Sequence, residues 1–285
     1  MMSGVRLRLE LAYDGTDFRG WAKQPGLRTV QGELESAIDT ILRTRGTTVT
    51  VAGRTDTGVH ARGQVVHVDL DDTALSAAPG RGEATPAEAM RRRINGVVGR
   101  DLRVHLVTEA PEGFDARFSA LWRRYAYRIS DETALVDPLR RNHVVTWPRP
   151  LDLDAMNEAS ALLVGLKDFA AFCKKREGRT TIRTLLDLDW TRTDGVLVAN
   201  VRADAFCHSM VRSLVGCLTA VGEGRRTPQW AADVMAGRER RPDVVVAPAH
   251  GLTLEEVGYP DDVEVARQAL LTRARRSLVD DADDD

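Results

Sequence analysis

The chain has 285 residues, with 40 Lys and Arg against 42 Asp and Glu, and a formal net charge of -2 at pH 7. Hydrophobic residues make up 43% and charged residues 29%, close to the averages of folded globular domains, which argues against a disordered chain, a collagen-like repeat or a disulfide-stapled miniature. The charge balance by itself favours neither nucleic acid nor membrane as a partner. The length suits one large domain or two ordinary ones.

The three cysteines give no sign of a disulfide framework or a zinc knuckle. Cys173, Cys207 and Cys217 lie far apart, form no C-x-x-C pair and are odd in number, so we expect a reducing, cytoplasmic setting. The first residues alternate apolar and charged side chains, and no stretch approaches the roughly 18 apolar residues of a membrane span. We therefore expect neither a signal peptide nor a transmembrane helix.

The first third of the chain predicts the element order β-α-β-β-α-β. Val5, Leu7, Leu9 and Leu11 alternate with charged residues, which is typical of a strand with one buried face. A helix with 3.6-residue spacing follows from a Thr29 cap to about Arg45. The remaining elements are expected as strands over 47–51, 64–70 and 102–107, a loop over 71–84, and a helix that starts with the capping box Thr85-Pro86-Ala87-Glu88 and runs to about Val98.

The same order recurs from Trp122 onward. It comprises strands at 122–130, 182–192, 195–206 and 252–257, helices at 152–164 and 208–221, and a short extra helix after Thr227-Pro228. The sequence therefore predicts an α/β (α+β) fold of two ferredoxin-like or RRM-like halves with largely antiparallel sheets. We expect an N-terminal half over 1–110, a C-terminal half over 111–270, and a disordered acidic tail over 271–285.

The most unusual segment is Gly53-Arg54-Thr55-Asp56-Thr57-Gly58-Val59-His60-Ala61, between two expected strands. Its glycines have the spacing of a phosphate loop, but Val59 and His60 stand where Lys and Ser or Thr are required, which excludes a P-loop. What remains is a carboxylate between two threonines, with the Arg54 guanidinium two residues before it. Either Asp56 is held ionised for chemistry, or it shapes an Asx-type turn.

Two further segments carry candidate residues. Tyr125 and Tyr127 alternate with Arg124 and Arg128 on one strand, as on a surface that stacks nucleobases and contacts phosphates. Alternatively, both tyrosines are core residues with the arginines solvated opposite. Arg212 lies at the edge of the buried stripe of the helix after Phe206-Cys207-His208, where it either faces a site or is solvated. The histidines are isolated, so we predict no metal site.

The arrangement of charge is more informative than its sum. Five of the 42 acidic residues are aspartates in the last seven positions, so 40 basic residues outnumber the remaining 37 acidic ones. Basic pairs and triplets recur along the chain, and one folded surface can gather several of them into a phosphate-binding track. The runs are Arg91–Arg93, Arg123–Arg124, Arg140–Arg141, Lys174–Arg176 and Arg225–Arg226.

Together these segments resemble the tRNA pseudouridine synthase A family. The resemblance covers about Leu9 to Tyr259 and rests on YDGTDFRGW, TVQGELE, GRTDTGVHA with GQVVH, FDARFSA leading to RRYAYRI, GLKDFAAF, FCHSMVRSLVG and APAHGLTL, in the family's order. GRTDTGVHA is highly specific. The segment 71–88 is longer than a compact member of the family needs, and the Asp-rich tail matches nothing in it.

The resemblance implies a cofactor-independent isomerase that converts uridine to pseudouridine at positions 38, 39 and 40 in the tRNA anticodon stem-loop, and a homodimer that binds tRNA. It also implies that Asp56 is the nucleophile and that Tyr125 stacks on the target base. Arg212 would pair with Asp56, and Arg54 would position the nucleotide. The chemistry agrees, because breaking the C1′–N1 bond and joining C1′ to C5 involves no net oxidation or hydrolysis.

Two other function classes stay open on the residues alone. One is a non-catalytic RNA-binding protein built from RRM-like sheets, although neither half shows the aromatic-rich RNP1 pattern. The other is a hydrolase of glycosidic bonds that uses Asp56 with Asp115 or Asp168, which requires the second carboxyl within about 10 Å of the first.

Overall fold

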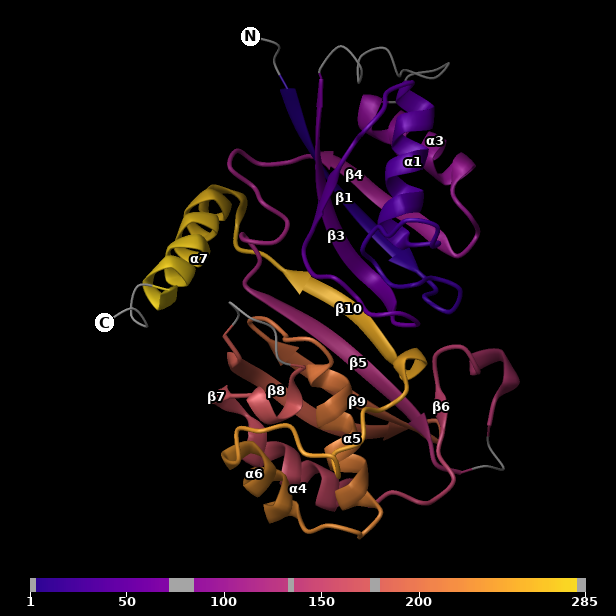
Figure 1. The fold of residues 1–285 in the computed structure, drawn as a ribbon. Coiled ribbons are helices and arrows are strands. Elements are labelled where there is room, and N and C mark those ends of the chain that lie inside the picture. Colours follow the sequence, from indigo (N-terminus) through magenta and orange to yellow (C-terminus); the bar gives the residue numbers. More distant parts are fainter. Residues whose placement is uncertain (1–3, 72–84, 133–135, 175–179, 281–285) are drawn as a thin grey trace. The chain divides into compact units, whose positions relative to one another are not determined.

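The computed structural model describes residues 4–71, 85–132, 136–174 and 180–280. The chain divides into two compact units, of which the first comprises residues 1–121 and 256–285 and the second residues 122–255. Each unit combines a mostly antiparallel sheet with helices, so the predicted mixed α/β class is confirmed (Figure 1). The predicted loop over 71–84 lies, apart from Asp71, outside the described residues.

The first unit has the predicted order β-α-β-β-α-β. Its elements are β1 (Gly4–Tyr13), α1 (Val30–Leu42), β2 (Val49–Val51), β3 (His60–Asp71), α3 (Pro86–Val97) and β4 (Leu102–Glu109). β1 is the central strand, antiparallel to β3 on one side and β4 on the other, and β2 pairs with β3. α1 and α3 lie side by side (Figure 1), and both bury apolar side chains.

The caps of these two helices are those that the sequence indicates. The Thr29 side chain accepts a hydrogen bond from Gly32 N, and Thr85 with Glu88 forms a complete capping box. The first helix ends at Leu42, short of the predicted Arg45, because Arg43 adopts a left-handed conformation with φ 55°. The Asp39 carboxylate then accepts hydrogen bonds from Gly46 N and Thr47 N, which directs the chain into β2.

The second unit contains β5 (Trp122–Ser130), β6 (Val145–Thr146), α4 (Leu153–Leu163), β7 (Gly165–Asp168), β8 (Ile182–Thr193), β9 (Val196–Ala203), α5 (Met210–Gly222) and α6 (Pro228–Ala236). Its sheet runs in the order β5-β9-β8-β7, with antiparallel neighbours, and β6 pairs with β5 in parallel. α4, α5 and α6 pack together (Figure 1). The short strands β6 and β7 are absent from the sequence prediction, because two to four residues show too little periodicity.

The chain returns from the second unit to the first through β10 (Leu252–Gly258). The expected C-terminal half over 111–270 differs from this division. Residues from 256 onward belong with the first unit, to which they are bound: Tyr259 OH donates to Ala116 O, and Ser119 Oγ donates to Val265 O. α7 (Val265–Asp280) follows, a helix where the sequence predicts a disordered tail from 271; residues 281–285 lie outside the described ranges.

Candidate active site

Asp56 lies in a tight turn between β2 and β3. Val59 N donates to Asp56 O at 3.1 Å, and Gly58 adopts a left-handed φ of 77° within that turn. The main chain of residues 56–59 thus closes this turn with a hydrogen bond of its own. Asp56 is half-buried and Arg54, two residues earlier, is exposed. The turn therefore presents a carboxylate and a guanidinium from one short segment.

The loop after β1 supports this turn from a distant part of the sequence. Trp21 N donates to Thr55 O at 3.1 Å. Gly20 has a φ of 86°, and a Cβ there would lie 3.1 Å from Thr55 O and 3.2 Å from Thr57 N. A side chain at Gly15 would lie 2.1 Å from Val59 O, which is an impossible contact. The glycines of YDGTDFRGW therefore let one loop pack directly on the backbone of the other.

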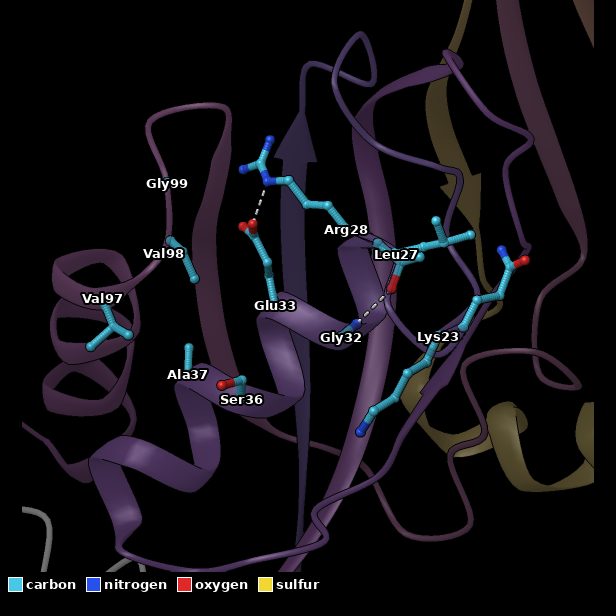
Figure 2. Close-up of a pocket in the computed structure, with 12 residues that line it drawn as sticks. Lys23, Leu27, Arg28, Gly32, Glu33, Ser36, Ala37, Val97, Val98 and Gly99 are labelled. Carbon is cyan, nitrogen blue, oxygen red and sulfur yellow. Dashed lines mark hydrogen bonds and ion pairs between the residues drawn. The ribbon is translucent and has the colours of Figure 1, made fainter.

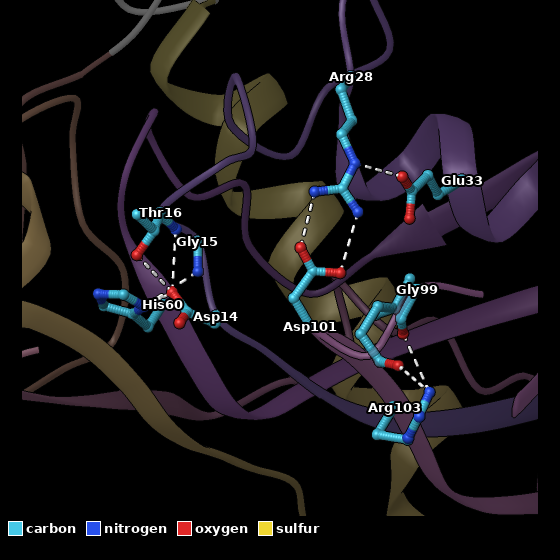
Figure 3. Close-up of polar contacts among 10 residues, drawn as sticks. Asp14, Gly15, Thr16, Arg28, Glu33, His60, Gly99, Asp101 and Arg103 are labelled. Atoms are coloured by element: carbon cyan, nitrogen blue, oxygen red, sulfur yellow. Dashed lines mark hydrogen bonds and ion pairs between the residues drawn. The ribbon is translucent and has the colours of Figure 1, made fainter. Parts of the chain in front are cut away.

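His60 completes the junction between the two loops. Its Nδ1 accepts a hydrogen bond from Gly15 N at 2.9 Å, as Figure 3 shows. The neighbouring Asp14 carboxylate accepts from Thr16 N and Thr16 Oγ1, which fixes the start of the loop. His60 is 5% exposed and is a structural residue of the turn.

Tyr125 and Tyr127 come from β5 in the second unit, where they face Val201 and Ala199 across the ladder to β9. Tyr127 is fully buried and donates from its hydroxyl to Pro248 O at 2.9 Å. Tyr125 is 7% exposed and packs edge-on against the partly exposed Phe206, with ring centroids 5.1 Å apart and an interplanar angle of 88°. Both tyrosines are thus buried, as the core interpretation expects, but only Tyr125 borders a partly exposed aromatic ring.

Arg128, one of the two arginines that the alternative expects to be solvated, is instead hydrogen-bonded within the protein. Arg128 donates to Glu255 Oε1 at 2.5 Å and to Thr253 Oγ1 at 3.3 Å. Arg123 is buried and donates to Asp204 O at 2.8 Å. The bonds of Arg128 attach β5 to the start of β10, and the bond of Arg123 attaches β5 to Asp204, two residues before Phe206.

Arg212 lies in the first turn of α5 and is fixed by the segment that precedes β10. Arg212 Nε donates to Ala247 O at 2.6 Å, and Ala247 N donates back to Arg212 O at 3.0 Å. Burial raises the pKa of the Tyr127 hydroxyl well above its usual range, while the Arg212 charge acts in the opposite direction. The APAHG segment therefore holds both Arg212 and Tyr127, which the sequence spacing does not show.

The four predicted site residues come from two units: Asp56 and Arg54 share one turn of the first, while Tyr125 and Arg212 come from β5 and α5 of the second. The two carboxylates of the hydrolase alternative both have structural roles. Asp115 accepts from Arg117 N, Phe118 N and Arg273 Nη2 and is 6% exposed. Asp168 accepts from Ala170 N and Thr181 Oγ1.

Cys173 and Cys207 form a disulfide across 34 residues, with Cα atoms 5.7 Å apart. This pair corrects the expectation, drawn from the wide spacing and odd number of the cysteines, that the chain has no disulfide. The third cysteine, Cys217, is buried in α5, and burial raises the pKa of its thiol to about 12.

A cavity of about 400 Å³ lies elsewhere in the first unit, between the loop after β1, the first turns of α1 and the end of α3 (Figure 2). Asp56 and Arg54 are not among its lining residues. Its cationic side chains are engaged: Lys23 contacts Glu35, and Arg28 contacts both Glu33 and Asp101 (Figure 3). The cavity is thus separate from the Asp56 turn.

Among the residues that the structure describes, no three His, Cys, Asp or Glu side chains gather as a metal site. Within the same ranges, no helix is long and apolar enough to cross a membrane.

Comparison with known proteins gives a consistent result. A family model described as tRNA pseudouridine synthase matches residues 159–260. A protein from Frankia casuarinae named tRNA pseudouridine synthase A is 58% identical over 273 residues, which covers 95% of this chain and 96% of that one. Proteins of the same name from Streptomyces griseus and Mycobacterium leprae are 56% and 51% identical, over 96% of this chain in each case and 95% and 96% of their own lengths. At this identity over nearly its whole length, the chain belongs to the tRNA pseudouridine synthase A family, whose members are isomerases that convert uridine to pseudouridine.

Proposed function

We propose that this protein isomerises uridine to pseudouridine at positions 38, 39 and 40 in the anticodon stem-loop of tRNA. In this proposal Asp56 is the nucleophile, Tyr125 stacks on the flipped base, Arg212 pairs with Asp56 and Arg54 positions the target nucleotide. The observation that carries it is the Asp56 turn, in which the half-buried Asp56 stands between two threonines on a backbone closed by the bond from Val59 N to Asp56 O. The family resemblance of GRTDTGVHA supplies the assignment of the chemistry.

The first step of the proposed mechanism is extrusion of the target base. Unstacking a base costs a few kcal/mol, and stacking on an aromatic side chain returns about 1–3 kcal/mol. Tyr125 and the partly exposed Phe206 form a T-shaped pair with ring centroids 5.1 Å apart. In this proposal the uracil stacks on Tyr125 beside the Phe206 ring.

The second step is attack by the Asp56 carboxylate, at uracil C6 or at ribose C1′, followed by cleavage of the C1′–N1 bond. The uracil turns within the site, C1′ joins C5, the bond to the Asp56 carboxylate breaks and restores the free carboxylate, and the proton leaves C5 for N1. A carboxylate in a site that excludes water needs an opposite charge to stay ionised. Arg212 is suited to this role because the bond from its Nε to Ala247 O fixes the guanidinium plane, and a guanidinium carries five N–H donors.

The decisive experiment compares the parent protein with Asp56→Asn on tRNA transcripts without added metal, with pseudouridine mapped chemically. Three transcripts test the position: each has a uridine at only one of positions 38, 39 and 40 and keeps the uridines elsewhere in the tRNA. We expect product at each position with the parent protein and none with Asp56→Asn, because an amide is not a nucleophile. Asp168→Asn is the matched control, since its carboxylate accepts structural hydrogen bonds from Ala170 N and Thr181 Oγ1 near β7.

Three outcomes would contradict the proposal. Isomerisation by Asp56→Asn at the parent rate would remove Asp56 from the mechanism. Product at uridines outside positions 38 to 40 would refute the site of action. Release of free uracil would favour the glycosidic hydrolase instead.

We also propose that the protein acts in the cytoplasm as a homodimer, on the strength of the family resemblance. Sedimentation of the free protein and of its tRNA complex measures the oligomeric state. A monomer at micromolar concentration, in both the absence and presence of tRNA, would contradict the dimer.

A further inference from the structure

A chain of buried polar groups lies directly beneath the Asp56 turn. The Tyr13 hydroxyl, at the end of β1, is 2.8 Å from Thr55 Oγ1. Gln64, on β3, donates from Nε2 to Tyr13 OH at 3.2 Å and to Gly53 O at 2.8 Å. Gln64 is 0% exposed and Tyr13 4%. Three segments of the first unit thus meet through side chains that the proposed mechanism does not use.

The direction of each hydrogen bond in this chain can be worked out. Gln64 Oε1 accepts from Val65 N, which places the amide nitrogen of Gln64 toward Gly53 and Tyr13. The Tyr13 oxygen therefore accepts from Gln64, and its own proton goes to Thr55 Oγ1, since a buried hydroxyl proton without an acceptor is costly. Burial raises the pKa of Tyr13 to about 12, so the hydroxyl stays protonated and remains a donor at neutral pH.

This hydrogen-bond network holds the turn at Gly53 and Thr55, both on the N-terminal side of Asp56. Gly53 and Thr55 are the residues on either side of Arg54, and Thr55 directly precedes Asp56. Thr55 is bound twice, by its side chain to Tyr13 and by its carbonyl oxygen to Trp21 N. A buried hydrogen-bond network of this kind rigidifies the backbone to which it is attached. The geometry of the network therefore fixes the backbone positions from which the Asp56 and Arg54 side chains extend.

We propose that Tyr13, Thr55 and Gln64 are positioning residues for pseudouridine formation, which place Asp56 and Arg54 through the backbone of the turn. The inference rests on the proposed function of Asp56. Small displacements matter here, because a misplacement of about 1 Å can lower the rate of a positioned reaction by about 100-fold.

The test uses variants that remove single hydroxyl groups and keep the shape of the side chain. Thr55→Val and Tyr13→Phe each break the bond between the two hydroxyls, and Thr55→Ser restores it. We expect Thr55→Val and Tyr13→Phe to lower the single-turnover rate by about tenfold or more, with the Kd for tRNA unchanged. Thr55→Ser should recover most of the rate. Tyr259→Phe is the matched control, because it also removes a tyrosine hydrogen bond in the first unit, to Ala116 O.

The double variant Tyr13→Phe/Thr55→Val tests whether the two hydroxyls act through the same bond or independently. If they act through one bond, the single-turnover rate of the double variant should fall by about the same factor as that of either single variant. A fall equal to the product of the two single-variant factors would overturn the proposal. So would a parent-like rate for Thr55→Val, or an equal rate loss in Tyr259→Phe at the same Tm. If Tyr13→Phe does not fold, the comparison of Thr55→Val with Thr55→Ser still decides.

The Asp56→Asn result distinguishes the two levels of inference. If Asp56→Asn is inactive and Thr55→Val keeps the parent rate, the network is overturned while the function of Asp56 stands. If Asp56→Asn is active, both are overturned.

Discussion

Gly216 lies in α5, one turn after Arg212, and the backbone of residues 245–247 passes directly over it. A Cβ at Gly216 would lie 1.6 Å from Val245 O. To reach an ordinary contact of 3.4 Å, that carbonyl must retreat by about 1.8 Å. A displacement of this size in the segment that carries Ala247 breaks the hydrogen bond from Arg212 Nε, now 2.6 Å long.

The change in the free energy of unfolding for Gly216→Ala combines one stabilising and two destabilising contributions. Alanine gains about 1 kcal/mol of helix propensity over glycine. Overpacking costs about 1–3 kcal/mol, and loss of a hydrogen bond to a charged, partly exposed group costs about 1 kcal/mol or more. We therefore expect a net loss of about 2 kcal/mol in the free energy of unfolding, together with a lower rate of pseudouridine formation because Arg212 is displaced.

Urea unfolding followed by tryptophan fluorescence measures the effect, since Trp21 reports on the first unit and the other four tryptophans on the second. With a urea m-value of about 1–3 kcal/mol/M, the midpoint should fall by about 1 M. Gly96→Ala in α3 is the control, because nothing lies within 4 Å of its Cβ and the substitution should stabilise by about 0.5–1 kcal/mol. If Gly216→Ala is as stable as Gly96→Ala, the close approach over α5 is wrong.

Three further predictions concern separate features. Tyr125→Phe should bind tRNA normally but turn over more slowly if the hydroxyl takes part in proton transfer; unchanged turnover would leave only the ring in the mechanism. Hydrogen bonds from Arg28 hold the pKa of Asp101 below its usual 3.8. The ion pair therefore stabilises the fold fully above pH 3.8, and this stabilisation is lost as the pH falls through the lowered pKa of Asp101. Asp101→Asn should accordingly lose less stability than the parent between about pH 6 and about pH 3 in urea titrations, and parallel losses would refute this. Thr85→Ala should cost about 1 kcal/mol of unfolding free energy by removing the capping box of α3; a variant with the parent's urea midpoint would show that the cap contributes nothing.

Local rules account for most of the elements. The alternation of Leu7, Leu9 and Leu11 with charged residues suffices to predict β1, and the caps at Thr29 and Thr85 suffice to start α1 and α3. The sequence also identifies the Asp56 turn as a candidate site, because two glycines and a lone carboxylate between strands are unusual and match a family segment. Such features depend on residues a few positions apart, whose interactions are set by backbone geometry alone.

The sequence predicts too little structure at the C-terminus. The aspartates in the last seven residues suggest a solvated tail, but α7 extends to Asp280. Its start is fixed by tertiary contacts: Val265 and Ala269 are buried, and Arg273 pairs with Asp115 at 2.8 Å. The composition of a segment gives no information on whether a partner surface exists to bury its apolar residues.

The sequence by itself therefore determined the family, the mixed α/β class and the position of the candidate Asp56 turn. Only the tertiary structure decided what holds the candidate site in shape. The bonds of Tyr13 to Gln64, of Arg212 to Ala247 and of Cys173 to Cys207 join residues 51, 35 and 34 positions apart. No periodicity or spacing links such pairs, because their contact depends on how the strands and helices pack and not on the local preferences of either residue.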